Sequence, residues 1–254
     1  MTILLWILCV DGLGYELWKE YGLELQYEGE LKIPKQCYRN QYPFTPDVWG
    51  SMFLGEIFKH PKSKEIELSP LRLEARKFLR QRGIKWSRRG TKIKTFDTEH
   101  TIPSYIVFEQ MSQKTVFDEF NSFKWGIPSV CDGFLFKSYE GNVQDHEAFK
   151  SMVFSQYCRT FDLVGIYTHL LDEVAHRVIK KGDSNYKRLK YLYNEIFFLY
   201  EFLEKKNDDI IVVSDHSCYG IHGDLAFIGS NNILVASNIL DVHNEIKKIM
   251  LKNN

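Results

Sequence analysis

The chain of 254 residues is long enough for one large domain, and its 44% hydrophobic and 15% aromatic content supports a substantial core. The formal net charge is zero, which gives no basis for a global attraction to nucleic acid or to an anionic membrane. Five scattered cysteines without a C-x-x-C pair argue against a disulfide framework or a thiolate zinc site. They favour a reducing, cytoplasmic location.

The first expected element is a buried strand over residues 3–10, the apolar run ILLWILCV. The run lacks the basic start and the small-residue cleavage site of a signal peptide. It is also too short to span a membrane, as is every other apolar run in the chain. A strand of a parallel sheet, buried on both faces, explains it best, and it ends at Asp11-Gly-Leu-Gly14.

Helices and further strands alternate along the rest of the chain. The patterns predict helices over 46–58, 69–83, 186–206 and 239–251, and strands over 105–108, 161–167, 209–214 and 225–228. This alternation indicates an α/β fold with a mostly parallel central sheet and helices on both faces. We expect a single catalytic domain over 1–254, with candidate cap or insertion segments around 62–100 and 109–149.

Polar residues follow three of the expected strands, where the carboxyl ends of parallel strands share one edge of the sheet. Taken singly, each is explained as a turn, a cap or a solvated pair. Together they supply three carboxylates and three imidazoles, a ligand set that suits Zn²⁺, Mn²⁺ or Fe. These residues are Asp11, Asp172, His176, Asp215, His216 and His222.

Thr45 has two readings that use the same geometry. It is an N-cap candidate, with Pro46 at the first helical position and Asp47 in the first turn, so it can simply cap a helix. A hydroxyl at a helix N-terminus also lies beside free backbone N–H groups and the positive end of the helix dipole. A phosphoryl group attacked by Thr45 would have its oxygens held there, and a metal on the hydroxyl would make it a nucleophile.

The order of these segments resembles the alkaline phosphatase superfamily, and in particular its type I phosphodiesterase/nucleotide pyrophosphatase branch. The resemblance rests on short islands spread over nearly the whole chain. They are Asp11-Gly-Leu, Thr45-Pro with Trp49 and Gly55, Leu171-Asp172-x-x-x-His176, Ser214-Asp215-His216, Gly220-Ile-His222-Gly223, and the tail Ala226-Phe-Ile-Gly229 followed by Ile239-Leu-Asp241.

The resemblance implies an alkaline-phosphatase-like fold and a two-metal hydrolase of phosphodiesters or nucleotide pyrophosphates. One ion, held by Asp11, Asp215 and His216, would touch Thr45, and the other would be held by Asp172, His176 and His222. The metal is expected to be zinc, with manganese or iron as alternatives. Thr45 would attack phosphorus and form a phospho-threonine intermediate, which water activated at the second ion would hydrolyse.

The chain departs from the family pattern in three places. Ser217 follows the Asp-His pair and Ala175 precedes His176, where the family often has glycine, and neither change removes a ligand. Asp47 or Val48 lies where nucleotide pyrophosphatases commonly have an asparagine. Cys218 is expected to pack in the interior, without a role as a ligand.

The substrate side is less specific. The segment 72–94 carries ten basic residues against one acid, which fits a solvated face or a collar for a nucleotide or oligonucleotide. Trp86 and Trp49 are candidates for stacking on a base, and Trp49 is the better one because it lies near Thr45. The alternatives are a phosphomonoesterase or phosphomutase on the same scaffold, and a nucleic-acid-binding protein with a degenerate site. We expect no membrane partner, and the oligomeric state is open.

Overall fold

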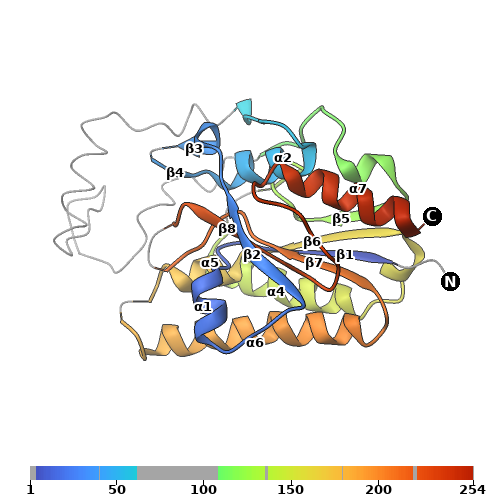
Figure 1. Ribbon diagram of the computed structural model, residues 1–254. Coiled ribbons are helices and arrows are strands. Elements are labelled where there is room, and N and C mark those ends of the chain that lie inside the picture. Colours follow the sequence, from blue (N-terminus) through green and yellow to red (C-terminus); the bar gives the residue numbers. More distant parts are fainter. Residues whose placement is uncertain are drawn as a thin grey trace.

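A six-stranded sheet forms the centre of the molecule (Figure 1). The computed structural model describes residues 4–39, 41–61, 108–134, 137–178, 180–219 and 222–253. The strand order is β2-β8-β7-β1-β6-β5, in which β1, β5, β6 and β7 run parallel and β8 is antiparallel to both of its neighbours. The bounds are β1 Leu5–Val10, β2 Tyr27–Lys32, β5 Ser122–Trp125, β6 Leu163–Thr168, β7 Asp209–Val213 and β8 Leu225–Ser230. The mostly parallel α/β sheet expected from the sequence is therefore confirmed.

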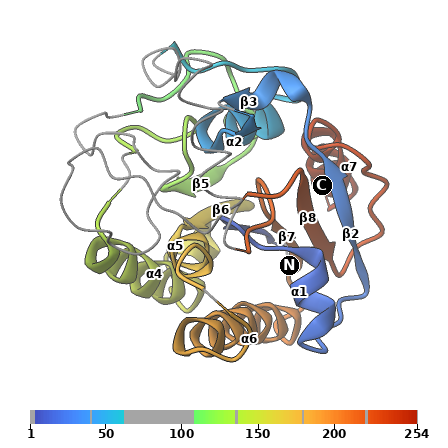
Figure 2. The same cartoon turned by 90° about the vertical axis from the view of Figure 1, so that its left-hand side faces the viewer.

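Strand β1 is buried over all six residues because both faces of the sheet are covered by helices. Its alternate side chains enter two separate cores, Trp6, Leu8 and Val10 on one side and Leu5, Ile7 and Cys9 on the other. Figures 1 and 2 show α1, α4, α5 and α6 on the first side and α2 and α7 on the second. The helix bounds are α1 Tyr15–Glu20, α2 Thr45–Leu54, α4 Tyr139–Val153, α5 Leu170–Ala175, α6 Ser184–Glu204 and α7 Asp241–Asn253.

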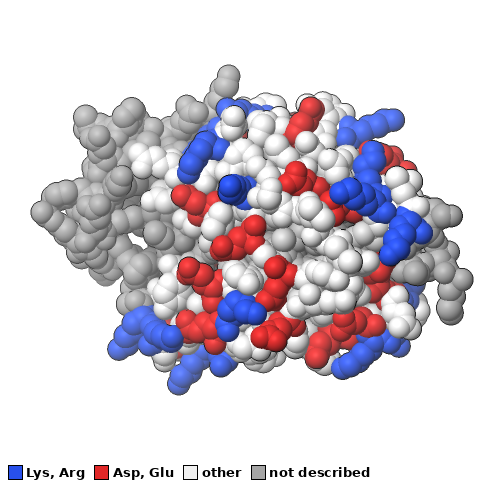
Figure 3. Space-filling view, in the orientation of Figure 1, with Lys and Arg blue, Asp and Glu red and all other residues white. Residues whose placement is uncertain are grey.

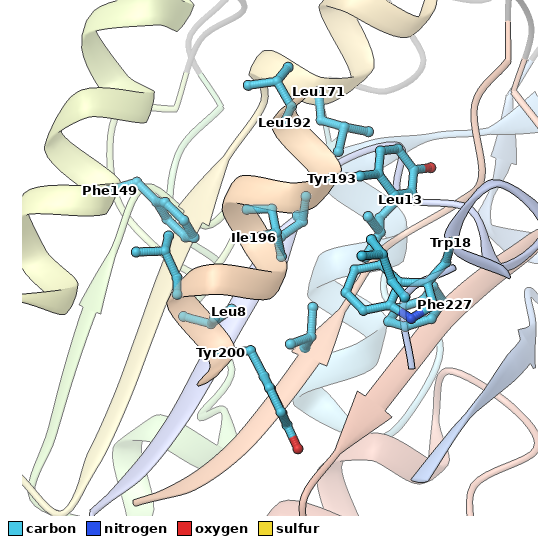
Figure 4. Close-up of a cluster of buried hydrophobic side chains, with 14 of the residues drawn as sticks. Leu8, Leu13, Trp18, Phe149, Leu171, Leu192, Tyr193, Ile196, Tyr200 and Phe227 are labelled. Atoms are coloured by element: carbon cyan, nitrogen blue, oxygen red, sulfur yellow. The ribbon is translucent and has the colours of Figure 1, made fainter. Parts of the chain in front are cut away.

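The longest helix, α6, forms where the apolar spacing predicts it. The Asp183 side chain caps its start by accepting a hydrogen bond from the Tyr186 N–H at 2.7 Å. Its buried stripe packs against the sheet, as Figure 4 shows for Leu192, Tyr193, Ile196 and Tyr200. Each such side chain contributes about 1.5–3 kcal/mol on burial, so the stripe fixes the helix against β1 and β7.

The segment 109–149 contributes to the central layers. It contains the 3₁₀ turn η3 (Val116–Glu119), the edge strand β5 and most of helix α4. Periodicity did not indicate α4, whose apolar positions are few. The smaller elements are η1 Lys35–Cys37, η4 Cys158–Thr160, and the hairpin of β3 Tyr38–Arg39 and β4 Tyr42–Pro43 that leads into α2.

Several expectations fall outside the described residues. These are the helix over 69–83, the strand over 105–108 apart from Phe108, the segment 62–100, the basic stretch 72–94 and Trp86. On the face shown in Figure 3, the basic and acidic side chains of the described residues are interspersed. Ion pairs such as Lys19–Glu28 at 2.8 Å join side chains of opposite sign. Among the residues that could be searched, no helix has the length and apolar character needed to cross a membrane.

Candidate metal centre

The candidate ligands come from the carboxyl ends of three adjacent parallel strands. Asp11 follows β1, His169 follows β6, and Asp215 and His216 lie two and three residues beyond β7. The Asp11 N–H donates to the Thr168 carbonyl at 3.0 Å, which extends the ladder between β1 and β6 by one residue. Because parallel strands end at the same edge, residues more than 200 positions apart meet there. Figure 2 views the sheet from this edge.

The first group consists of Asp11, Asp215 and His216, all fully buried. His216 Nε2 lies 3.1 Å from Asp11 Oδ1 and 3.5 Å from Asp215 Oδ2. Within the described part of the chain, neither Asp215 oxygen nor Asp11 Oδ1 accepts a hydrogen bond. Burial and the neighbouring Asp11 carboxylate raise the pKa of Asp215 well above its ordinary value. Buried carboxylate oxygens without donors are costly, and a divalent cation is a partner that would remove this cost.

The second group consists of Asp172, His176 and His222 together with Cys218. Asp172 lies on α5 and His176 is its C-cap, so their i, i+4 spacing places both on one face. The Nε2 atoms of His176 and His222 lie 3.0 Å apart. Asp172 Oδ2 lies 3.4 Å from His176 Nε2, and Asp172 Oδ1 lies 3.6 Å from His222 Nε2. The sequence predicted three of these residues as neighbours, whereas it assigned Cys218 to packing.

One loop between β7 and β8 supplies both groups. Its His216 belongs to the first group and its His222 to the second, and the two rings stack with centroids 3.8 Å apart. The loop is tied to the turn after β1, because Ser214 Oγ donates to the Leu13 carbonyl at 2.8 Å and the Cys218 N–H donates to the Gly12 carbonyl at 3.1 Å. These bonds fix the position of Asp215 and His216 relative to Asp11.

Gly12 allows the two groups to approach each other. Its φ of +76° lies in the left-handed region, which costs little only for glycine. A Cβ atom at this position would lie 2.8 Å from the Asp172 Cβ and 2.9 Å from its Cα. The turn after Asp11 therefore packs directly against the backbone of Asp172. A side chain at position 12 would move this turn, and the first group with it, away from Asp172.

Tyr167 and His169 are site residues that the sequence reasoning did not select. Both donate to Asp11 Oδ2, the tyrosine hydroxyl at 2.5 Å and His169 Nδ1 at 2.6 Å. Burial opposes the charged forms of Asp11 and His169, but each stabilises the charge of the other. The Asp11 carboxylate raises the pKa of His169 to about 9, and His169 lowers the pKa of Asp11. A polar residue directly after an apolar strand is the signal that could have identified His169.

The two oxygens of the Asp11 carboxylate face different partners. Oδ2 is occupied by Tyr167 and His169, while Oδ1 faces His216. Outer partners of this kind orient a carboxylate ligand and tune its basicity. His169 also forms a third candidate cluster with Asp11 and Asp172, so Asp11 lies at the junction of the whole centre.

Thr45 is the first residue of α2, and Phe44 occupies the N-cap position without a side-chain cap. The prediction that Thr45 is the N-cap is therefore wrong, since Thr45 is already the first helical residue and Pro46 is the second. Thr45 is 3% exposed. Contacts on either side place this turn near the centre: the Tyr42 ring lies edge-on to His222 at 6.4 Å, and the Trp49 ring lies edge-on to Tyr167 at 5.8 Å.

Trp49 does not offer a surface for a base, which corrects the expectation that it binds substrate. Its side chain is fully buried and stacks on Phe53 with centroids 5.9 Å apart. With its other neighbour Tyr167 edge-on, the ring packs α2 onto the sheet. Asp47 is also buried and forms an ion pair with Arg39 at 2.9 Å.

A cavity of about 350 Å³ adjoins the centre and is lined by Tyr167 and His169. Its other walls come from β5, α4 and the described residues between them, and include Trp125, Phe134 and Asn142. The Asn142 side chain is 3% exposed, and its amide nitrogen donates no hydrogen bond within the described residues. Among the described lining residues, Lys124 and Lys137 face Asp132 and Asp145, and His169 is held by Asp11.

Comparisons with known proteins give similarities of fold. No family model and no curated protein matches the sequence. The PH0037 protein from Pyrococcus horikoshii matches with 11% identity and a TM-score of 0.52, over 100% of this chain and 98% of that one. The alkaline phosphatase from the Antarctic bacterium TAB5 matches with 12% identity and a TM-score of 0.49, over 98% of both chains.

A protein in the alkaline phosphatase superfamily from Vibrio parahaemolyticus covers 98% of this chain and 66% of its own, with 11% identity and a TM-score of 0.39. At 11–12% identity the likeness concerns the fold, and the chemistry of the centre follows from its own side chains.

Proposed function

We propose that this protein is a metal-dependent phosphoric ester hydrolase that acts on phosphodiesters or nucleotide pyrophosphates through Thr45 and two divalent ions. The observation that carries the proposal is the pair of buried carboxylate–imidazole groups, whose His216 and His222 rings stack at 3.8 Å. Both groups contain Asp and His donors, which suit Zn²⁺ first and Mn²⁺ or Fe as alternatives. Pairs of such ions clamp the attacking and leaving oxygens of an in-line displacement.

The metal ligands and Thr45 have different roles in the proposed reaction. When bound, the ions neutralise phosphoryl oxygens and favour the deprotonated form of a hydroxyl beside them. Asp11, Asp215 and His216 would hold the ion nearer Thr45, and Asp172, His176 and His222 the other. Thr45 attacks phosphorus, the alcohol departs on the opposite side, and a phospho-threonine forms. Water then cleaves the P–O bond to Thr45 and releases the phosphomonoester. The positive end of the α2 dipole, beside Thr45, would stabilise the phosphoryl oxygens, since the Asp47 and Val48 N–H groups already donate to the Phe44 carbonyl.

The cavity beside His169 supports a diester over a monoester. Among the described residues that line it, two lysines are offset by two aspartates, Lys137 pairs with Asp145 at 2.8 Å and His169 pairs with Asp11 at 2.6 Å, which leaves these residues little excess positive charge for a dianionic terminal phosphate. Its aromatic walls and the amide of Asn142 suit the uncharged organic group that a diester carries in addition. A cytoplasmic location and a contribution of segment 72–94 to binding oligonucleotides stay predictions.

Turnover of two chromogenic esters tests the proposal. Protein loaded with Zn²⁺ or Mn²⁺ should hydrolyse bis-p-nitrophenyl phosphate with a higher kcat/KM than p-nitrophenyl phosphate. A clear preference for the monoester would overturn the diester assignment and favour a phosphomonoesterase or phosphomutase. Salt-sensitive binding of an oligonucleotide without any hydrolysis would favour the degenerate nucleic-acid-binding alternative.

Three substitutions at one position isolate the nucleophile. Thr45→Ala and the similarly shaped Thr45→Val should each remove nearly all turnover, whereas Thr45→Ser, which keeps the hydroxyl, should retain part of it. A trapped phosphoryl group on the wild-type chain, located by mass spectrometry at position 45, would identify the intermediate. Near-normal turnover in the valine variant would reduce Thr45 to a structural residue.

A further inference from the structure

Cys218 lies among the ligands of the second group. Its side chain is 1% exposed, and its Sγ atom lies 3.8 Å from both ring nitrogens of His176. The ligand atoms of Asp172, His176, Cys218 and His222 all lie within 4.8 Å of one another. Among the candidate metal groups of the described residues, this is the one that contains a cysteine and the one with four members.

The separations are close to those of a coordination tetrahedron. Zinc bound to nitrogen, oxygen and sulfur at its usual distances of about 2.0–2.3 Å places neighbouring ligand atoms about 3.3–3.7 Å apart. Here the two imidazole Nε2 atoms lie 3.0 Å apart, His176 Nε2 lies 3.4 Å from Asp172 Oδ2, His222 Nε2 lies 3.6 Å from Asp172 Oδ1, and Sγ lies 3.8 Å from the His176 Nε2. Small shifts of these side chains therefore suffice to enclose one ion.

The backbone fixes Cys218 in this position. Its N–H donates to the Gly12 carbonyl at 3.1 Å, and it pairs with His222 in an antiparallel bridge. The thiol and the His222 imidazole therefore come from two arms of one narrow hairpin. Gly12 itself presses on Asp172, so three of the four ligands depend on the same turn.

We propose that Cys218, as a thiolate, is the fourth protein ligand of a tetrahedral Asp–His–Cys–His zinc site. The proposal rests on the proposed function, since it adds a ligand to the second of its two metal sites. Binding displaces the thiol proton, which is released to solvent. The charges of one thiolate and one carboxylate then balance those of one Zn²⁺ ion.

Two consequences follow for the centre. A thiolate is a soft ligand, so it selects Zn²⁺ over Mg²⁺ and Mn²⁺ at the second group. With four protein ligands the second ion would contact substrate by expanding to five-coordinate, whereas the first group, with three, keeps an open position. The second ion also orders the loop that carries His216.

Metal spectroscopy tests the ligand directly, without any turnover. X-ray absorption of the zinc-loaded wild type should show a sulfur scatterer at about 2.3 Å. Cobalt-loaded wild type should show a near-ultraviolet thiolate-to-metal charge-transfer band, which Cys218→Ser should abolish. Cys158→Ser is the matched control: Cys158 is equally buried, at 1% exposure, and lies outside all three candidate metal groups, so its spectrum should equal that of the wild type.

The outcomes separate this inference from the proposed function. A zinc shell of nitrogen and oxygen alone in the wild type, or a cobalt spectrum unchanged in Cys218→Ser, would overturn the cysteine ligand even if diesters are hydrolysed. A sulfur-ligated ion in a protein that hydrolyses no phosphate ester would support the ligand and overturn the function. If Cys218→Ser fails to fold, the wild-type absorption data decide the question.

Discussion

The rings of His216 and His222 stack with their centroids 3.8 Å apart, although the two residues serve different candidate metal groups. They belong to one loop, which is tied by Ser214 and Cys218 to the turn after β1. An ion at either group therefore orders the same loop, and the two groups should fill cooperatively.

Removing one ligand from each group tests this arrangement. Elemental analysis should find close to two divalent ions in the wild type. His222→Ala should lose the second ion and Asp215→Ala the first, and each should weaken the other by several-fold because the loop is shared. His243→Ala, on α7 and outside the candidate groups, is the control. A wild-type protein that binds no ion would contradict both assignments.

Gly12 should be sensitive to the smallest side chain. Gly12→Ala combines a positive φ with a Cβ placed 2.8 Å from Asp172, so it should lower the free energy of unfolding by about 3 kcal/mol or more. Gly22→Ala is a matched control with φ +73° and open space around the new Cβ, and it should cost about 1 kcal/mol. Equal losses in the two variants, measured by urea unfolding, would show that the contact with Asp172 is unimportant.

Tyr167 should act through Asp11. Burial and the adjacent Asp11 carboxylate raise the pKa of the Tyr167 hydroxyl, so it stays protonated and donates to Oδ2. Tyr167→Phe keeps the ring packed on Trp49 and Phe134 and removes that donor. Metal affinity at the first group should fall by about 10- to 100-fold. Chelator competition measures this, and an unchanged affinity would mean that His169 holds Asp11 without help.

Glu195 should contribute stability that disappears in acid. Burial alone would raise its pKa, but hydrogen bonds from His146 at 3.2 Å and Lys150 at 2.8 Å lower it to about 2. Because the folded pKa lies below the unfolded value, the contribution is fully present above about pH 4.5 and is lost as the pH falls toward 2. Glu195→Gln should therefore destabilise the fold by about 1–3 kcal/mol at pH 7 and by much less at pH 2.

The control for Glu195 is an acid that pairs with the same lysine at the surface. Glu147 lies 2.7 Å from Lys150, but its side chain is 64% exposed. Glu147→Gln should change stability by less than about 0.5 kcal/mol at either pH, because water screens the pair. Denaturant unfolding at the two pH values compares the variants. A constant loss in Glu195→Gln across this range would exclude the linkage.

The sequence by itself determined the layers of the fold. Continuous apolar runs predicted β1, β6 and β7, and the 3.6-residue spacing predicted α6, because these patterns are set locally by which faces are buried. Helix α4 and strand β5 gave no comparable signal. Helix α4 has few apolar positions, and β5 is a short edge strand whose four residues are only partly buried.

The strand ends predicted that the six candidate ligands share one edge of the sheet, and the family resemblance implied their two groups. Asp11, Asp215 and His216 do converge, as do Asp172, His176 and His222. Only the tertiary structure decided the surroundings of these residues. It buried Trp49, placed Tyr167 and His169 on one oxygen of Asp11, and brought Cys218 beside His176. Such contacts depend on loop paths and ring orientations set by packing between distant segments, whereas strand polarity follows from the local pattern of the chain.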